Sequence, residues 1–331
     1  MLAITASACS GSGTAQEPVA AGRSGGPVCP LTGTPVPRDG DSGRPAVAVK
    51  VENSPEARPQ SGLDAADLVY EEPVEGGLSW LIAVFQCSDP PLVGPVRNAH
   101  PSDTAILAGH GSALFAHAGA AASGAVGAVN SLHQVDALRS GEAFQRLDGR
   151  SPPHNLYASM PKLRALAKDG GPPRPWATFR LPGSSKPSAS PSAGVTPSPP
   201  TGTSAQFTLG PASVRWTWDS RAEAYERHQG TALFTDPDGR PITVSNVVFL
   251  WVKVTETDTR DAAGGRTPVL TLTGQGDALV LDGGMEHSGR WIRRSVADPP
   301  SLVDRKGHPM TLAPGHSWIV FLPVDTPVFV R

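Results

Sequence analysis

The feature that most constrains the fold of this chain is the stretch from residue 46 to residue 85, which holds its strongest strand patterns. Residues 46–52 alternate valine with other side chains, and an alternation of period two predicts a strand. Two further strands are predicted at 67–72 and 78–86, on either side of a glycine-containing turn. Residues 78–86 are apolar on both faces, so we expect this strand at the centre of a sheet.

Polar side chains gather on the loops that follow these strands and on similar loops further along the chain. Functional groups concentrate on loops that a rigid frame holds in place. If the strands form one sheet, these loops could converge on one edge of it. The candidate ligand-binding residues are Glu52, Asn53, Arg58, Gln60, Ser61, Arg97, His100, His117, Asn155 and Tyr157.

Three residues are candidates for acid–base catalysis: Glu71, Glu75 and His154. Glu71 and Glu72 are neighbours on a strand and point to opposite faces, so they cannot act on one bond together. The alternative is structural: Glu72 and Glu75 are solvated charges, Glu71 pairs with Arg58 or Arg97, and His154 clamps its own proline-rich loop. The sequence leaves open whether the chain is an enzyme.

Several classes of site find no support in the sequence. No HExxH or CxxC motif and no nucleotide-binding glycine pattern is present, so we expect neither a metal nor a cofactor. The net charge of −2 gives no basic field, which argues against nucleic acid as a partner.

The three cysteines suggest an extracytoplasmic location. The sequence ASAC at residues 6–9 is similar to the end of a bacterial lipoprotein signal, which predicts lipidation at Cys9, although a basic region and a full apolar run are missing. The alternative is a tail in which this cysteine occurs by chance. Cys29 and Cys87 then remain as a disulfide pair or as two free thiols, and spacing alone does not decide between them.

The chain of 331 residues is long enough for two domains, and its 35 prolines and 36 glycines favour turns and short strands. Short helices are predicted at 63–66, 102–108 and 159–168. We therefore expect an α+β fold. Its predicted parts are a truncated lipoprotein signal and flexible tether at 1–29, an N-terminal mixed α/β sheet domain at 30–171, a Pro/Ser/Thr-rich linker or insertion at 172–206, and a C-terminal mainly-β domain at 207–331.

The C-terminal part contains several tryptophans on predicted strands: Trp216, Trp218, Trp251, Trp291 and Trp318. Their rings could stack on sugars. The alternative is that they are core residues, which aromatic side chains at period-two strand positions usually are.

Seven segments carry a family resemblance: RPAVAVKVENSPEARPQSGLDAADLVYEEPVEGGLSWLIAVF, VGPVRNAHP, ALFAHAGA, PHNLY, GDALVLDGG, GRWIRR and LAPGHSWIVFLP. Together they resemble the YerB-like bacterial lipoproteins, which pair an N- and a C-terminal domain of unknown function (DUF3048 type). The resemblance covers residues 30–322 apart from the linker. It implies a bacterial, membrane-anchored, extracytoplasmic protein without an established activity. The chain departs from the family pattern at His100 and at Trp80, where relatives carry arginine.

These observations favour an envelope lipoprotein, anchored through Cys9 to the outer face of the cell membrane, that binds a cell-wall or envelope ligand through its N-terminal loops. The alternative is a hydrolase or transferase that acts on a cell-wall glycan or peptide with a Glu/His pair. A third hypothesis is a scaffold whose polar loops only stabilise the fold.

Overall fold

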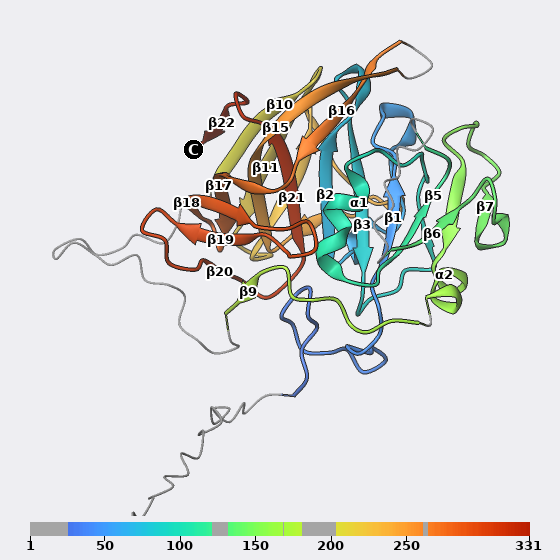
Figure 1. Cartoon of the computed structure of the whole chain (residues 1–331), viewed down its shortest axis with the longest axis horizontal. Coiled ribbons are helices and arrows are strands. Elements are labelled where there is room, and N and C mark those ends of the chain that lie inside the picture. The colour runs from blue at the N-terminus through green and yellow to red at the C-terminus, as the bar shows by residue number, and fades with distance from the viewer. Residues whose placement is uncertain (1–25, 121–131, 168, 181–202, 261–263) are drawn as a thin grey trace, which may run out of the picture.

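One large mixed β-sheet carries most of the fold (Figure 1). The computed structural model describes residues 26–120, 132–167, 169–180, 203–260 and 264–331. The strand order of this sheet, which we call the large sheet, is β19-β18-β17-β15-β21-β2-β3-β1-β5-β6, with β16 paired to β15. The strands are β1 (Val47–Val51), β2 (Leu68–Pro73), β3 (Ser79–Phe85), β5 (Leu114–His117), β6 (His133–Asp136), β15 (Asn246–Arg260), β16 (Arg266–Thr271), β17 (Gly274–Asp282), β18 (Met285–Arg293), β19 (Ser301–Asp304) and β21 (Ser317–Pro323).

A separate antiparallel sheet lies in the C-terminal part of the chain. It comprises β10 (Ser204–Leu209), β11 (Ala212–Asp219), β12 (Ala224–Gln229), β13 (Ala232–Leu233), β14 (Thr243–Val244) and β22 (Val328–Val330). We call it the small sheet. The α+β expectation is confirmed, with strands strongly predominating.

The remaining elements are short. Two further ladders join β4 (Leu92–Val93), β7 (Phe144–Arg146) and β8 (Leu156–Ser159), and β9 (Thr178–Phe179) with β20 (Thr311–Leu312). The helices of the described residues are α1 (Asp103–Leu107), α2 (Met160–Leu166) and the 3₁₀ turns η1 (Pro55–Ala57), η2 (Leu63–Ala65), η3 (Glu75–Gly77), η4 (Ala108–His110) and η5 (Gly141–Ala143). Among the described residues, no helix is long and apolar enough to cross a membrane.

The two halves of the chain meet inside the large sheet. Strand β2 pairs in parallel with β21, in a register that sets Leu68 opposite Ser317 and Glu71 opposite Val320. Strand β3 lies between β2 and β1, and this confirms the central position expected from its apolar faces. The strands of the predicted N- and C-terminal domains therefore form one continuous hydrogen-bonded sheet.

The large sheet is covered on both faces. On one face, Val49, Leu81 and Val69 share a core with residues of the small sheet such as Phe207 and Trp216. On the other face, a second core contains residues of the same strands together with α1 and Trp176. Trp176 lies within the predicted linker, yet it is only 2% exposed and its indole Nε1 donates to Leu31 O at 3.0 Å. The linker prediction is wrong at this end, while residues 181–202 lie outside the described residues.

Cys29 and Cys87 form a disulfide, with their Cα atoms 6.0 Å apart. The bond joins the start of the described chain to the residues that follow β3. Of the two alternatives that the sequence left open, the structure contains the disulfide.

Glu71 ties the small sheet to the large one. Its side chain is fully buried; Oε1 accepts hydrogen bonds from Arg227 Nη2 at 2.9 Å and Ser79 Oγ at 2.6 Å, and Oε2 accepts one from Trp318 Nε1 at 2.8 Å. The Arg227 guanidinium lies 4.4 Å from the ring centre of Phe234 and is also fully buried. Burial lowers the pKa of Arg227, and the charge of Glu71 opposes this shift. The expected pairing of Glu71 with Arg58 or Arg97 is therefore wrong.

Breaking this pair from one side should destabilise the protein strongly. Arg227→Met leaves the Glu71 carboxylate buried without its cation, so we expect a loss of about 3–5 kcal/mol in the free energy of unfolding. Replacing both residues, as Glu71→Leu with Arg227→Met, should restore part of the loss because no charge is left buried. Urea unfolding measures each variant.

Arg215→Ala, an exposed arginine on β11, is the matched control and should change stability by less than about 0.5 kcal/mol. An Arg227→Met protein as stable as this control would show that the buried pair does not hold the sheets together.

Candidate functional site

A connected group of polar side chains lies on the α1 side of the large sheet, at the end of β1 and β2. We call it the polar cluster. Its members are Lys50, Glu52, Glu72, Glu75, Trp80, Arg97, His100, Asp103, His117 and His154. Strand alternation places Lys50 and Glu72 on the face opposite to Glu71, as expected from the sequence.

The most buried part of the cluster is a lysine between two carboxyl groups. Lys50 Nζ donates to Glu72 Oε1 and, at 2.7 Å, to Asp103 Oδ1, and all three side chains are almost completely buried. Burial together with the nearby Asp103 raises the pKa of Glu72 well above its ordinary value, although Lys50 opposes this. Burial alone would raise the pKa of Asp103. The charge of Lys50 and the hydrogen bond from Glu72 outweigh burial, so the pKa of Asp103 is lowered overall. Of the two carboxyl groups, Glu72 therefore binds a proton the more tightly, and Asp103 is the more readily ionised partner of Lys50.

This group also has the spacing of a metal site. Ligand atoms of Glu72, His100 and Asp103 lie within 4.8 Å of one another. However, the Lys50 ammonium already lies against both carboxyl groups and supplies the positive charge that they need. The arrangement is therefore that of a buried ion pair with its own cation.

His100 connects this buried core to the η3 turn. Its Nε2 lies 2.8 Å from Glu75 Oε2, and its backbone N–H donates to Asp103 Oδ2 at 2.8 Å. Burial raises the pKa of Glu75, but the hydrogen bond with His100, the nearby Thr267 hydroxyl and the charge of His100 outweigh it, so that the pKa falls to about 2. The carboxylate of Glu75 is thus held in a buried pair and is not a solvated hairpin charge.

Glu52, Arg97 and His154 form the part of the cluster that reaches solvent. Glu52 Oε2 lies 3.0 Å from His154 Nδ1 and 3.5 Å from Arg97 Nε. The Arg97 guanidinium lies 5.4 Å from the ring centre of Trp80, and the Trp80 ring meets the His100 ring edge-on at 4.8 Å. The side chains of Arg97 and His154 are 26% and 21% exposed, while that of Glu52 is 3% exposed. A ligand from solvent would therefore meet Arg97 and His154 first.

His117 lies at the end of β5, on the same face of the large sheet as Lys50. In the parallel pairing of β5 with β1, Ala116 lies opposite Val49, so His117 follows on the face of Lys50. The Arg97 backbone runs between the two strands: its N–H donates to Lys50 O at 3.1 Å, and its carbonyl accepts from Ala118 N at 2.9 Å.

Besides Arg97 Nε, which has only the ion-pair contact with Glu52, three buried nitrogens of the cluster have no hydrogen-bond partner within the described part of the protein: Trp80 Nε1, His100 Nδ1 and His117 Nε2. Buried polar groups in folded proteins are nearly always bonded, and an unbonded one costs about 1–3 kcal/mol. Trp80 contacts the Arg97 guanidinium and His100 contacts Trp80, so at least two of these nitrogens lie close to an arginine that reaches solvent.

The other predicted ligand-binding residues hold loops in position. Gln60 Nε2 donates to Glu52 O at 2.9 Å, and Arg58 Nη2 donates to Asn53 O at 2.7 Å. Burial and the nearby Arg227 lower the pKa of Arg58 to about 10, against the effect of Glu71, so Arg58 belongs to the Glu71 side of the sheet.

The remaining predicted ligand-binding residues on loops also hold those loops in position. Ser61 pairs through its backbone with Gly94, Asn155 Oδ1 accepts from Arg146 at 2.6 Å, and Tyr157 OH accepts from Arg150. None of these contacts places a side chain in the polar cluster.

Two of the three predicted catalytic residues do not fit that role. Glu71 lies on the small-sheet face with both oxygens bonded, and Glu75 is paired with His100. The carboxylate next to His154 is Glu52, which the sequence had placed among the ligand-binding residues. Sequence reasoning also missed Lys50, Glu72 and Asp103 as cluster members; the only signal was a lysine in an otherwise apolar strand.

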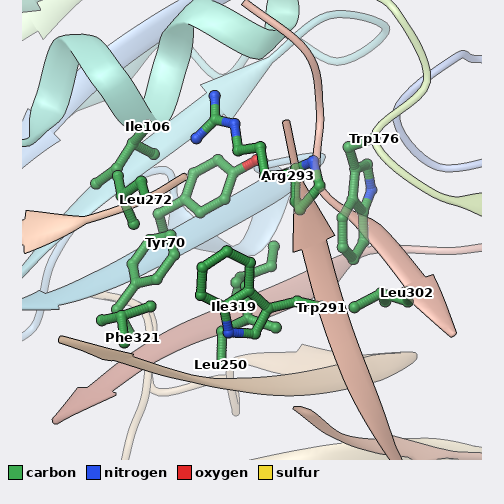
Figure 2. A pocket seen from close by; sticks show the side chains of 12 residues that line it. Tyr70, Ile106, Trp176, Leu250, Leu272, Trp291, Arg293, Leu302, Ile319 and Phe321 are labelled. Atoms are coloured by element: carbon green, nitrogen blue, oxygen red, sulfur yellow. The ribbon is translucent and has the colours of Figure 1, made fainter. Parts of the chain in front are cut away.

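A small enclosed cavity lies elsewhere, beneath α1. It has a volume of about 20 Å³, enough for one water molecule, and Figure 2 shows the side chains of Tyr70, Trp176, Trp291 and Phe321 around it. Tyr70 OH lies 2.8 Å from His110 Nε2, and burial together with Arg293 lowers the pKa of His110 to about 4. Since its lining is mostly apolar and its volume small, we regard it as a packing gap in the core.

Comparisons with known proteins agree with the fold. The N-terminal domain of a protein of unknown function (DUF3048) matches residues 31–172, and the C-terminal domain of the same family matches residues 204–319. This chain belongs to the DUF3048 family. The resemblance that the sequence motifs predicted is thereby confirmed.

The relatives are bacterial. The chain is 29% identical over 305 residues to "Putative lipoprotein YerB" of Bacillus subtilis (strain 168), covering 89% of this chain and 86% of that protein. The crystal structure of the Bacillus subtilis YerB protein superposes with a TM-score of 0.74 at 26% identity, covering 91% of this chain and 99% of that one. Neither name states a ligand or a reaction.

The Glu75–His100 pair should make stability depend on acidity. The pKa of Glu75 falls from 4.5 to about 2 on folding, so its ionised form stabilises the fold above pH 4.5, and this contribution is lost as the pH falls from 4.5 to about 2. In His100→Asn the hydrogen bond and the charge that His100 contributes are lost while burial still raises the pKa of Glu75, so the loss of stability should begin at higher pH. Urea unfolding at a series of pH values measures the shift.

His308→Asn is the control, because His308 forms a comparable pair with Asp304 at 3.2 Å but is exposed. Its pH profile should match that of the wild type. If His100→Asn also matched the wild type, the coupling between His100 and Glu75 would be disproved.

Proposed function

We propose that this protein is a membrane-anchored extracytoplasmic lipoprotein that binds a cell-wall or envelope ligand at the polar cluster. The observation that carries the proposal is the set of three buried nitrogens without a partner beside the solvent-reaching Arg97. Trp80 Nε1 needs an acceptor, whereas the free nitrogens of neutral His100 and His117 rings need donors, so a ligand that carries both kinds of group would satisfy them. The rigid strands that present the cluster favour a fixed recognition site.

The chemistry of Arg97 favours an anionic group on the ligand. Among the described residues, only its Nε contacts a carboxylate, and neither Nη nitrogen forms a hydrogen bond. The end of the guanidinium is thus free to bind a carboxylate or phosphate with two parallel hydrogen bonds. Contact with Trp80 fixes the plane of the group. Carboxylates and phosphates are both common in bacterial envelope polymers.

The membrane anchor rests on the N-terminal sequence and on the name of the relative. Residues 6–9 are similar to a lipoprotein cleavage site, and Cys9 lies outside the described residues. The Bacillus subtilis relative is named as a lipoprotein. A single acyl chain binds a membrane only weakly, so stable anchoring requires more than one lipid chain on the cysteine.

Metabolic labelling tests the anchor. In bacterial cells that produce the full-length protein, a clickable fatty-acid analogue should label the wild type, and Cys9→Ser should abolish the label. Cys9→Ser should also move the protein from the membrane fraction to the soluble fraction. An unlabelled wild-type protein would contradict the proposed anchor at Cys9.

Sedimentation with purified peptidoglycan tests the ligand. The wild type should sediment with the polymer, and Arg97→Ala should lower the affinity about tenfold because the free guanidinium end is lost. The affinity of Arg97→Lys should lie between those of the wild type and Arg97→Ala, since lysine keeps the charge but lacks the planar guanidinium.

Arg139→Ala is the control, because Arg139 is 87% exposed and lies outside the cluster. Wild-type protein that does not sediment, or Arg97→Ala protein that sediments like the control, would contradict the proposed site.

The second candidate function is hydrolysis or group transfer on a cell-wall glycan or peptide. Its support is the 3.0 Å contact between Glu52 Oε2 and His154 Nδ1, because a carboxylate at Nδ1 orients the ring and leaves Nε2 of a neutral imidazole as a base. Fragments released from peptidoglycan by the wild type but not by His154→Asn would favour this function over binding alone.

A further inference from the structure

An open groove lies on the small-sheet side of the large sheet, in the C-terminal half of the chain. Its volume is about 380 Å³. Strands β15 to β18 provide most of its lining, including Trp251, Lys253, Thr271, Gln275, Asp277 and Arg290. The groove shares no lining residue with the polar cluster.

The groove forms where the small sheet stops covering the large one. Along β15, Phe249 belongs to the core between the two sheets, Trp251 is half-buried against its border, and Lys253 is exposed. Strand β17 changes in the same way, from Leu279 in that core to the exposed Asp277. The same alternation that builds the core therefore continues into a polar, open surface with a tryptophan at its border.

Trp251 is held in a fixed position. Its Nε1 donates to Thr326 O at 2.8 Å, and its carbonyl oxygen accepts from Trp291 Nε1 at 2.8 Å. Gly276 permits this contact, because a Cβ at that position would lie 2.4 Å from Trp251 O. The indole N–H of Trp251 is already bonded, so the surface that it can offer a ligand is apolar.

The polar side chains around Trp251 are free to bind. Among the described residues, Lys253, Asp277 and Arg290 form no ion pair and no side-chain hydrogen bond. Asp277 lies directly opposite Arg290 in the ladder, and Lys253 lies opposite Thr271. Because all of them extend from paired strands, the backbone positions from which they reach into the groove are set before any ligand arrives.

We propose that this groove binds a glycan chain, with one sugar ring against Trp251 and its hydroxyl and acidic or amide substituents bonded to Gln275, Asp277 and Arg290. A fixed apolar ring surface surrounded by unpaired polar groups matches a sugar, which has an apolar face and a polar edge. The site is separate from the polar cluster and does not depend on the function proposed for it.

Calorimetric titration of the full chain with a soluble N-acetylglucosamine hexamer, and with peptidoglycan glycan strands stripped of peptide, tests the proposal. At least one of these probes should bind the wild type. Arg290→Ala and Trp251→Ala should each weaken that binding about tenfold, the effect of losing a central contact. Arg290 is exposed and unpaired, so its variant keeps the test valid if Trp251→Ala does not fold.

Arg294→Ala, an exposed neighbour, is the control and should bind like the wild type. Arg97→Ala should also bind these glycans like the wild type, which separates this groove from the polar cluster. The proposal would be overturned if neither glycan bound, if Arg290→Ala had no effect, or if only free stem peptides bound in a groove-dependent way.

Discussion

Strand β2 is the constraint on which the rest of the structure depends, because its two faces belong to different parts of the protein. On one face, Glu71 is bonded to Arg227 of the small sheet and to Trp318 of β21. On the other face, the next residue, Glu72, is bonded to Lys50 in the polar cluster. The edge of β2 is itself paired with β21. The C-terminal half of the chain thus holds β2 in place, and β2 in turn positions the polar cluster.

The alternation of the sequence was sufficient to predict much of this frame. It predicted the strands β1, β2 and β3, the central position of β3, and the opposite orientations of Glu71 and Glu72. These properties depend on local spacing and burial, which a single sequence contains. The short helix that became α1 was predicted from proline and aspartate at its start for the same reason.

The partners of the buried charges could not be predicted in this way. Arg227 lies 156 residues after Glu71, and Asp103 lies 53 residues after Lys50. Each pairing depends on how distant strands and loops come together, so spacing contains no sign of it. Arg58 and Arg97 seemed suitable partners for Glu71 only because they are nearer in sequence. The same limitation hid the pairing of His154 with Glu52, which lie 102 residues apart.

The polar cluster is closer to a recognition site than to a reaction centre. Most of its charged groups are paired inside the protein: Lys50 with Asp103, and Glu75 with the His100 ring. What remains for a ligand is the free end of Arg97, the exposed edge of His154, and three buried nitrogens without partners. Trp80 Nε1 and Arg97 donate, whereas the free nitrogens of neutral His100 and His117 rings accept, since the other nitrogen of each ring donates to Glu75 or to Gly119 O. This mixture favours binding a polar group, while Glu52 with His154 is the arrangement in the cluster that would support proton transfer.

The most direct test of this account is the NMR spectrum of the histidine rings in protein labelled with ¹⁵N-histidine, titrated with soluble peptidoglycan fragments. The account predicts that the ring signals of His100, His117 and His154 shift together and reach saturation. The signals of His228 and His308, which lie outside the cluster, should stay unchanged. Unchanged signals for all three cluster histidines, or shifts confined to His228 and His308, would contradict the claim that the polar cluster is the ligand site.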